Sequence, residues 1–290
     1  MTKSFISSVF IAGAGFMGSA IAYLITTKSE AKVCLYDKYP DALKEAQATF
    51  KKFGNTALEK SLIKKDDLQR ARNSLTTIDN LNKLPDCDLV IEAIAENLAI
   101  KKELFSILDK KFAETTIFAS NTSSLSITAL AAATKRSKKF IGTHFFSPAH
   151  IMKLLEIIPG IDTSEQTIKY VVDFGKSLGK TVITSKDFPG FVTSRLGIVL
   201  LNEAAFALME GLSTPEEIDQ SMTLGYNHPM GPLALADFIG LDICLSIMET
   251  LQSGFGDPKY RPCPLMRQLV NAGHLGCKTG KGFYSYGAAR

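Results

Sequence analysis

The chain has 290 residues, 46% of them apolar, and its 33 basic and 29 acidic residues give a formal net charge of +4. This length and composition allow about two domains with separate cores. The surplus of positive charge is too mild to indicate nucleic-acid binding, and no apolar run approaches the length of a membrane span. Five scattered cysteines form no CxxC pair, and the first predicted strand begins too near the N-terminus for a signal peptide to precede it. We therefore expect a cytoplasmic protein with reduced thiols and with neither a membrane nor a nucleic-acid partner.

The first predicted strand, residues 9–12, leads into three glycines with the spacing of a dinucleotide-binding turn. Gly13 would allow a sharp turn out of the strand, and Gly15 would leave room for a pyrophosphate. Gly18 would let the next predicted helix, residues 16–27, pack close to the strand. Because glycine turns can also serve tight packing alone, the flanking elements decide between these two interpretations.

The elements around the glycines favour a nucleotide site. Backbone N–H groups at Phe16 and Met17, in the open first turn of the helix, would face the phosphates. The next predicted strand, residues 32–36, is followed by Asp37, about 20 residues beyond the last glycine, where an acid accepts a ribose 2′-hydroxyl. Asp37 would repel a 2′-phosphate, which favours NAD over NADP, although the neighbouring Lys38 weakens this preference.

Alternating strand and helix patterns continue through the first two thirds of the chain. Further strands are predicted at residues 74–77, 89–92, 116–119, 140–144, 155–158 and 181–184. Helices are predicted between several of them, at residues 41–53, 99–112, 127–132 and 164–178. This alternation indicates an α/β fold with a Rossmann-type doubly wound sheet, and we assign residues 1–187 to an NAD-binding domain.

The strand pattern stops after residue 187, and helical patterns continue to the end of the chain. Helices are predicted at residues 190–210, 215–223, 232–239 and 241–253. Residues 188–290 are therefore expected to form an all-α C-terminal domain. The first of these helices is apolar on more than one face, which fits either the centre of a small bundle or a subunit interface, and we favour a homodimer.

Three features lie where the carboxyl ends of the predicted strands would meet, and ligands bind at that edge of a doubly wound sheet. The segment 120–124, which includes Ser123, follows a strand; taken alone, such a segment is more often a polar turn and helix cap. His144 ends an apolar strand before two phenylalanines, and a partly desolvated imidazole is a natural general base. Glu156 lies within an apolar strand and needs a partner, which His144 could supply from the adjacent strand. No metal is invoked, because the four histidines of the chain show no ligand spacing.

Seven motifs together resemble the 3-hydroxyacyl-CoA dehydrogenase family. They occupy residues 13–18, 92–97, 120–124, 144–146, 152–156, 189–191 and 228–232, and the resemblance continues to residues 281–284. It implies a Rossmann domain followed by a helical dimerisation domain, and the chain length is most similar to that of the bacterial 3-hydroxybutyryl-CoA dehydrogenases.

The resemblance also implies roles for individual residues. His144 would be the catalytic base and Glu156 its partner. Ser123 would hydrogen-bond the substrate oxygen close to the cofactor, and Glu96 with Lys101 would lie along the cofactor. These roles are expectations that rest on the family and not on spacing.

Two residues depart from the family pattern. Ser194 stands where the family usually has an asparagine that helps to bind the substrate carbonyl, and Ser147 stands where an asparagine commonly contacts the cofactor. Serine keeps one donor but is shorter. Loss of a polarising donor can cost about 2–4 kcal/mol in the transition state. We retain Ser194 as a catalytic candidate and Ser147 as a cofactor-binding candidate.

The predicted reaction is the reversible, NAD(H)-dependent oxidation of a short (S)-3-hydroxyacyl-CoA, such as 3-hydroxybutyryl-CoA, to the 3-ketoacyl-CoA. Lys51 and Lys52 would bind the phosphates of CoA, or would only form a solvated helix face. Two alternatives remain open. One is a dehydrogenase of a free hydroxy acid or sugar acid, and the other is a cofactor-binding protein that has lost turnover.

Overall fold

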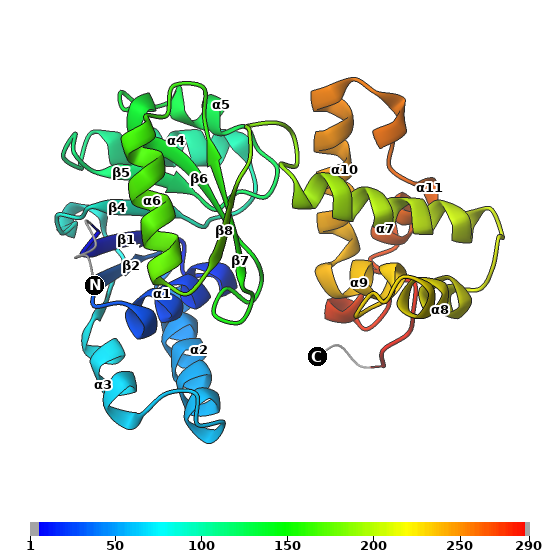
Figure 1. Cartoon of the computed structure of the whole chain (residues 1–290), viewed down its shortest axis with the longest axis horizontal. Coiled ribbons are helices and arrows are strands. Elements are labelled where there is room, and N and C mark those ends of the chain that lie inside the picture. Colours follow the sequence, from blue (N-terminus) through cyan, green and yellow to red (C-terminus); the bar gives the residue numbers. More distant parts are fainter. Residues whose placement is uncertain (1–5, 288–290) are drawn as a thin grey trace. The chain divides into compact units, whose positions relative to one another are not determined.

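The computed structural model describes residues 6–287 of the chain (Figure 1). The chain divides into two compact units, Met1–Asp187 and Phe188–Arg290. The first unit combines a mostly parallel sheet with helices, and the second is built from helices, which confirms the predicted fold class. Among residues 6–287, no helix has both the length and the apolar character needed to cross a membrane.

The N-terminal unit contains one eight-stranded sheet in the order β3-β2-β1-β4-β5-β6-β7-β8. The strands are β1 (Ser8–Ala12), β2 (Lys32–Tyr36), β3 (Leu75–Ile78), β4 (Leu89–Glu92), β5 (Ile117–Ser120), β6 (Phe140–Phe145), β7 (Leu154–Pro159) and β8 (Thr181–Thr184). All neighbouring strands are parallel except β6 and β7. The order reverses at β1, which lies between β2 and β4. Ligands of open α/β sheets bind at such a switch point, so this topology places the predicted nucleotide site there.

Helices cover both faces of this sheet. They are α1 (Phe16–Lys28), α2 (Pro40–Glu59), α3 (Lys65–Asn73), α4 (Leu98–Asp109), α5 (Ile127–Ala131) and α6 (Glu165–Ser177). Helices α1 and α6 pack on one face, where Leu24 and Phe174 join Ile11 in a single core. On the other face, Phe105 of α4 contacts the ring of Phe118 on β5. This alternation of strand side chains between two helical layers gives the sheet a buried surface on each side.

Helix α4 begins at a position fixed by a side-chain cap. The Oδ1 atom of Asn97 accepts a hydrogen bond from the backbone N–H of Ile100 at 3.1 Å. Asparagine is among the preferred N-cap residues because it satisfies one of the otherwise unpaired N–H groups of the first turn. The cap therefore sets where α4 starts. Lys101 consequently lies in the first turn of α4, within reach of the last residue of β4.

The C-terminal unit contains α7 (Thr193–Met209), α8 (Pro215–Gly225), α9 (Pro232–Ile239), α10 (Leu241–Phe255) and α11 (Pro264–Asn271). Its core gathers buried side chains from several of these helices, among them Leu201, Leu233 and Met248. Helix α7 starts three residues later than predicted. Gly190 and Phe191 both have positive φ angles, 73° and 51°, so the chain makes a turn there before the helix can begin.

Two helices of the structure have no counterpart among the predicted elements. Helix α3 buries only Leu68 and Ala71, and α11 buries only Met266. Helix α3 has no other apolar residue, so its segment shows no helical periodicity. Helix α11 does show it, because Leu265 and Met266 are followed four residues later by Leu269 and Val270, and the prediction missed this signal.

Candidate active site

The glycine turn between β1 and α1 has a packing that only glycine allows. Gly13 has a φ angle of 109°, and a Cβ atom on it would lie 2.6 Å from the carbonyl oxygen of Ala93. A Cβ atom on Gly18 would lie 1.8 Å from the carbonyl oxygen of Gly13. The space around Gly15 is different, because beyond its chain neighbours nothing lies within 4 Å of where its Cβ would be. Packing therefore explains Gly13 and Gly18 but leaves Gly15 without a structural reason.

Asp37 reaches from the end of β2 back to this turn. Its Oδ2 atom accepts a hydrogen bond from the backbone N–H of Ala14 at 2.9 Å. Its Oδ1 atom accepts one from the N–H of Tyr39 at 3.0 Å. The carboxylate thus helps to fix the glycine turn, a role that the sequence does not predict, and it stands beside the turn where a ribose would be expected.

These residues fit NAD. Gly15 is the N-cap of α1 and has no side chain with which to bond the first-turn N–H groups. The next residue, Phe16, is exposed, and Met17 is only partly buried. The open space beside Gly15 and the first turn of α1 would hold the pyrophosphate, and Asp37 would hold a ribose hydroxyl.

The Gly15→Ala variant tests this fit. We expect its Kd for NADH to rise about tenfold or more, equivalent to about 1.4 kcal/mol, because the new methyl group enters the space assigned to the pyrophosphate. Its melting temperature should stay close to that of the wild type, because the methyl group meets no protein atom. Fluorescence titration and thermal melting measure the two quantities. Gly225→Ala, where a Cβ is equally uncrowded, is the control, and a wild-type Kd in Gly15→Ala would contradict the site.

Four polar side chains lie along one face of the sheet, near the carboxyl ends of its central strands. Glu92 on β4 is in register with Ser120 on β5, and Ser120 is in register with Gly142 on β6. His144 lies two residues beyond Gly142, and it is paired with Glu156 on the antiparallel strand β7. Because side chains alternate between the faces of a strand, Glu92, Ser120, His144 and Glu156 all point toward the same side.

His144 and Glu156 contact each other directly. The distance between His144 Nδ1 and Glu156 Oε2 is 2.8 Å, and both side chains are buried. The ring of Phe146 lies 4.5 Å from the imidazole, centroid to centroid. The structure thus confirms the predicted adjacency of the two strands. A buried carboxylate in this position can orient an imidazole and stabilise its protonated form, which is what a histidine general base needs.

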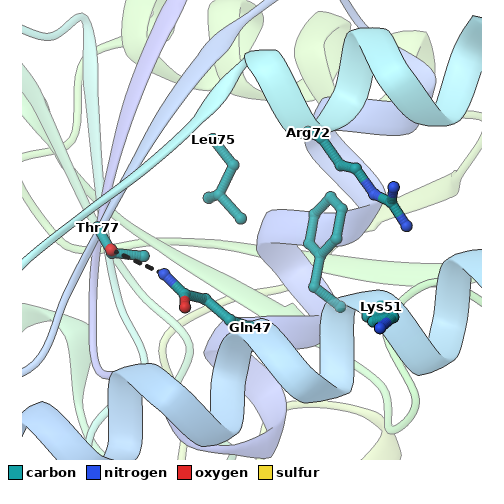
Figure 2. Close-up of a pocket in the computed structure, with 6 residues that line it drawn as sticks. Gln47, Lys51, Arg72, Leu75 and Thr77 are labelled. Carbon is teal, nitrogen blue, oxygen red and sulfur yellow. Dashed lines mark hydrogen bonds between the residues drawn. The ribbon is translucent and has the colours of Figure 1, made fainter.

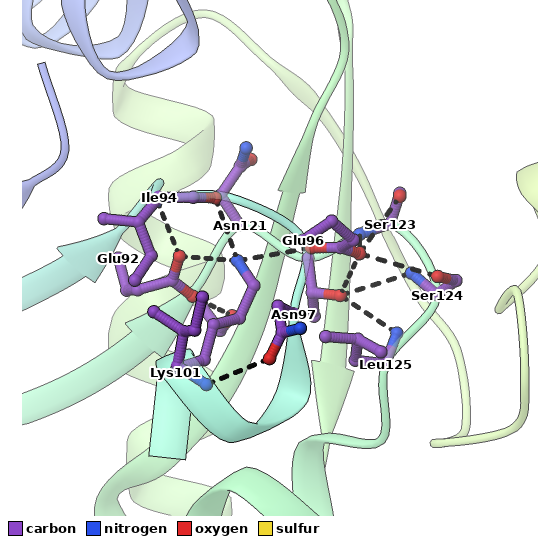
Figure 3. Close-up of polar contacts among 12 residues, drawn as sticks. Glu92, Ile94, Glu96, Asn97, Lys101, Asn121, Ser123, Ser124 and Leu125 are labelled. Atoms are coloured by element: carbon purple, nitrogen blue, oxygen red, sulfur yellow. Dashed lines mark hydrogen bonds and ion pairs between the residues drawn. The ribbon is translucent and has the colours of Figure 1, made fainter. Parts of the chain in front are cut away.

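Ser123 lies in a turn held by Glu96 (Figure 3). Glu96 Oε1 accepts hydrogen bonds from the backbone N–H of Ser123 at 2.9 Å, from its hydroxyl at 3.2 Å and from the hydroxyl of Thr122 at 2.5 Å. The other oxygen of Glu96 pairs with Lys101 Nζ at 3.2 Å. Burial alone would raise the pKa of Glu96, but the charge of Lys101 and these hydrogen bonds hold it below its usual range. Glu96 is therefore ionised at neutral pH.

Asn121 connects the same turn to the strand that carries the histidine. Its Oδ1 atom accepts a hydrogen bond from the backbone N–H of Phe145 at 2.9 Å, one residue after His144. The backbone N–H of Asn121 in turn donates to the carbonyl oxygen of Glu92 at 2.8 Å. Residues 120–124 are thus more than a polar turn, because they bridge β4 and β6 beside the imidazole.

The remaining predicted residues lie in other places. Ser147 is exposed and follows the end of β6. Ser194 is buried in the first turn of α7, in the C-terminal unit. Lys101 is 1% exposed, so its side chain is enclosed by protein and contacts Glu96 instead of offering an open surface to a cofactor.

A pocket of about 390 Å³ lies between α2, α3 and β3 (Figure 2). It is lined by Gln47, Phe50, Lys51, Arg72, Leu75 and Thr77. The amide of Gln47 donates to the hydroxyl of Thr77 at 3.3 Å. The structure therefore separates the two predicted lysines, because Lys51 lines this pocket together with a second cation, Arg72, whereas Lys52 does not line it.

The chain matches two parts of one family over nearly its whole length. Residues 8–188 match the family described as 3-hydroxyacyl-CoA dehydrogenase, NAD binding domain, and residues 190–286 match 3-hydroxyacyl-CoA dehydrogenase, C-terminal domain. The first match confirms the predicted NAD cofactor at the level of the domain.

Individual relatives give the same result. The chain is 48% identical over 283 residues to a "Probable 3-hydroxybutyryl-CoA dehydrogenase" of Bacillus subtilis, and the alignment covers 97% of the chain and 98% of that protein. It is 45% identical over 287 residues to a 3-hydroxybutyryl-CoA dehydrogenase of Bradyrhizobium diazoefficiens, with 98% of the chain and 97% of that protein covered. Among solved structures, (S)-3-hydroxybutyryl-CoA dehydrogenase from Ralstonia eutropha is similar with a TM-score of 0.93 and 45% identity, over 97% of the chain and 99% of that structure.

Proposed function

Since the chain belongs to the 3-hydroxyacyl-CoA dehydrogenase family, we propose that it interconverts a short (S)-3-hydroxyacyl-CoA and the corresponding 3-ketoacyl-CoA, with 3-hydroxybutyryl-CoA and acetoacetyl-CoA as the working pair. The observation that carries this proposal is the buried contact between His144 and Glu156 at the carboxyl end of the sheet. The names of the bacterial relatives support the short acyl chain.

In the proposed mechanism, bound NAD supplies the acceptor for the hydride that leaves C3 of the alcohol. His144 accepts the hydroxyl proton at Nε2, because Nδ1 faces Glu156. Glu156 holds the ring in this orientation and stabilises the imidazolium that forms. In the reverse direction His144 returns the proton to the oxygen as the ketone is reduced, so one residue serves as base and acid.

Ser123 is proposed to donate a hydrogen bond to the substrate oxygen. The Ser123 backbone is held by Glu96, and Asn121 ties the turn to β6, so the protein positions this residue before a substrate arrives. The single hydroxyl proton, which is donated to Glu96 in the structure, would turn to the substrate oxygen on binding. Such preorganised donors act mainly on the charge that develops in the transition state. Ser194 and Ser147 remain predicted contributors to the substrate and cofactor sites.

The pocket beside Lys51 is proposed to take part in binding the phosphates of CoA. We expect Lys51→Glu to raise KM for acetoacetyl-CoA about tenfold, because it places a carboxylate beside Arg72 in the pocket and repels the anion. Lys52→Glu is the matched control, since it makes the same change of charge one residue away and outside the pocket. Steady-state kinetics at low salt measure both. Equal KM values for the two variants would assign Lys51 to ordinary solvation.

A homodimer is proposed for the C-terminal unit. Several apolar side chains of this unit are exposed, including Leu196 on α7, Phe238 on α9 and Ile243 on α10. A second copy of the chain would remove such surface from water. We expect light scattering at assay concentration to give a mass of about twice the 31.6 kDa of one chain. A mass of one chain would contradict the dimer.

A further inference from the structure

Glu92 is a fully buried carboxylate that the proposed reaction does not use. It is the last residue of β4, and its side chain is 0% exposed. Its Oε1 atom accepts hydrogen bonds from the backbone N–H of Ile94 at 2.7 Å and from Lys101 Nζ at 2.5 Å. Its Oε2 atom accepts one from the hydroxyl of Ser120 at 2.6 Å. Each of these partners donates to the carboxylate, an arrangement that suits an ionised side chain. Burial acts in the opposite direction and raises the pKa of Glu92 above its usual value, although the charge of Lys101 and these hydrogen bonds oppose the rise.

Lys101 joins Glu92 to Glu96 (Figure 3). Its Nζ atom contacts Glu92 Oε1 at 2.5 Å, Glu96 Oε2 at 3.2 Å and the carbonyl oxygen of Ile94 at 3.3 Å. An ammonium group has three N–H donors, so these three oxygens can use all of them. The position of the ammonium group is consequently set by a balance between two carboxylates.

The second carboxylate of this group holds the turn that contains Ser123. Glu96 binds Lys101 through one oxygen and the Ser123 backbone and hydroxyl through the other. Its side chain is 32% exposed, in contrast to that of Glu92. The contacts therefore run without interruption from the interior, through Glu92, Lys101 and Glu96, to the surface turn.

A buried ion pair of this kind is a weak source of stability. Removing two charges from water costs several kcal/mol per ion, and well-packed apolar residues often stabilise a fold equally well. What the three charged side chains of Glu92, Lys101 and Glu96 do supply is a fixed position for one another. If the charge of Glu92 were lost, Lys101 would keep only one carboxylate, and the attraction would draw it and Glu96 together.

We infer that Glu92 is a positioning residue, which fixes Glu96 through Lys101 and so holds Ser123 in place. What Ser123 then does rests on the proposed function, whereas the chain of contacts does not. Ser120 supports the same assignment, because it is level with Glu92 in the sheet and begins the turn that Glu96 holds.

The Glu92→Gln variant tests this inference with little change in shape. Its amide oxygen can accept from Ile94 and Lys101, and its NH₂ group can donate to the hydroxyl of Ser120, so only the charge is lost. We expect the Kd for NADH to rise at least about fivefold and kcat/KM for acetoacetyl-CoA reduction to fall at least about tenfold. Fluorescence titration and steady-state kinetics measure these quantities on the full chain, and thermal melting reports the folded state.

Asp109→Asn is the matched control. Asp109 is the last residue of α4, at the opposite end of this helix from Lys101. It forms another enclosed ion pair of the same unit with Arg136, with 2.6 Å between Asp109 Oδ1 and Arg136 Nε. We expect this variant to lower the melting temperature without changing the Kd for NADH or kcat/KM. Equal kinetic losses in the two variants would overturn the inference, because they would show a general loss of stability.

Two further measurements apply if Glu92→Gln does not fold or if the wild-type chain shows no turnover. If Glu92→Gln fails to fold, Ser120→Ala removes one hydrogen bond to Glu92 and leaves all charges in place; we then expect a loss of kcat/KM in the same direction, and no change would overturn the inference. If the wild-type chain does not reduce acetoacetyl-CoA, the proposed function fails, but the NADH titration still tests the positioning of Glu96. If Glu92→Gln folds and has the wild-type Kd for NADH and the wild-type kcat/KM, the positioning role of Glu92 is also overturned.

Discussion

Replacing His144 with alanine will lower kcat for acetoacetyl-CoA reduction by about 10²–10⁴-fold, the usual contribution of a positioned general acid or base. The Kd for NADH should change little, because the imidazole acts on the substrate oxygen and His144 is not among the residues expected to hold the cofactor. Stopped-flow or steady-state absorbance of NADH measures the first quantity, and fluorescence titration measures the second.

The control for this variant is His274→Gln, a histidine of the C-terminal unit with no role in the proposed reaction. It should retain wild-type kcat. Turnover by His144→Ala within a few-fold of wild type would remove His144 from the mechanism, whatever the outcome for the other residues.

The second large effect is expected for Glu156→Gln. Glutamine keeps the size of the side chain but removes the charge that faces His144 Nδ1 at 2.8 Å. The imidazolium would then form without its stabilising partner, and the ring would be free to adopt the other tautomer. We expect kcat to fall by about 10²–10⁴-fold, comparable to the loss of the histidine itself.

Asp88→Asn provides the comparison for Glu156→Gln. Asp88 precedes β4 at the opposite end of the sheet and accepts hydrogen bonds from the backbone N–H groups of Ser7 and Ser8. These contacts hold the pKa of Asp88 below its usual range even though burial opposes this, so its loss should lower stability and leave kcat unchanged. If Glu156→Gln also keeps wild-type kcat, the carboxylate has only a structural role.

Much of the fold could be predicted because the sequence signals are strong and local. The glycines after β1, Asp37 after β2 and the alternation of apolar strands with helices each depend on a few neighbouring residues. Helix α3 could not be predicted from apolar periodicity, because Leu68 and Ala71 are its only apolar residues. Helix α11 could have been predicted, because its apolar residues at positions 265, 266, 269 and 270 have helical spacing and pack against the C-terminal core.

The candidate site also has a part that was predictable from the sequence and a part that was not. The adjacency of His144 and Glu156 was predictable, since a carboxylate within an apolar strand needs a partner and a histidine ended the preceding strand. Glu92 carries the same signal, an acid at the end of the apolar run that forms β4, but it is not among the predicted site residues. The link between Glu92 and Glu96 could not be predicted, because this link depends on the helix cap at Asn97, which brings Lys101 close to Glu92.

The measurement that tests the central claim most directly is steady-state reduction of acetoacetyl-CoA by the purified chain, with NADH and NADPH in parallel and His144→Ala as the inactive reference. The proposed function predicts turnover that is lost in the variant and is faster with NADH, because Asp37 would repel a 2′-phosphate. Absence of turnover with either cofactor, in protein that binds NADH, would contradict it and would favour a free hydroxy-acid dehydrogenase or a cofactor-binding protein instead.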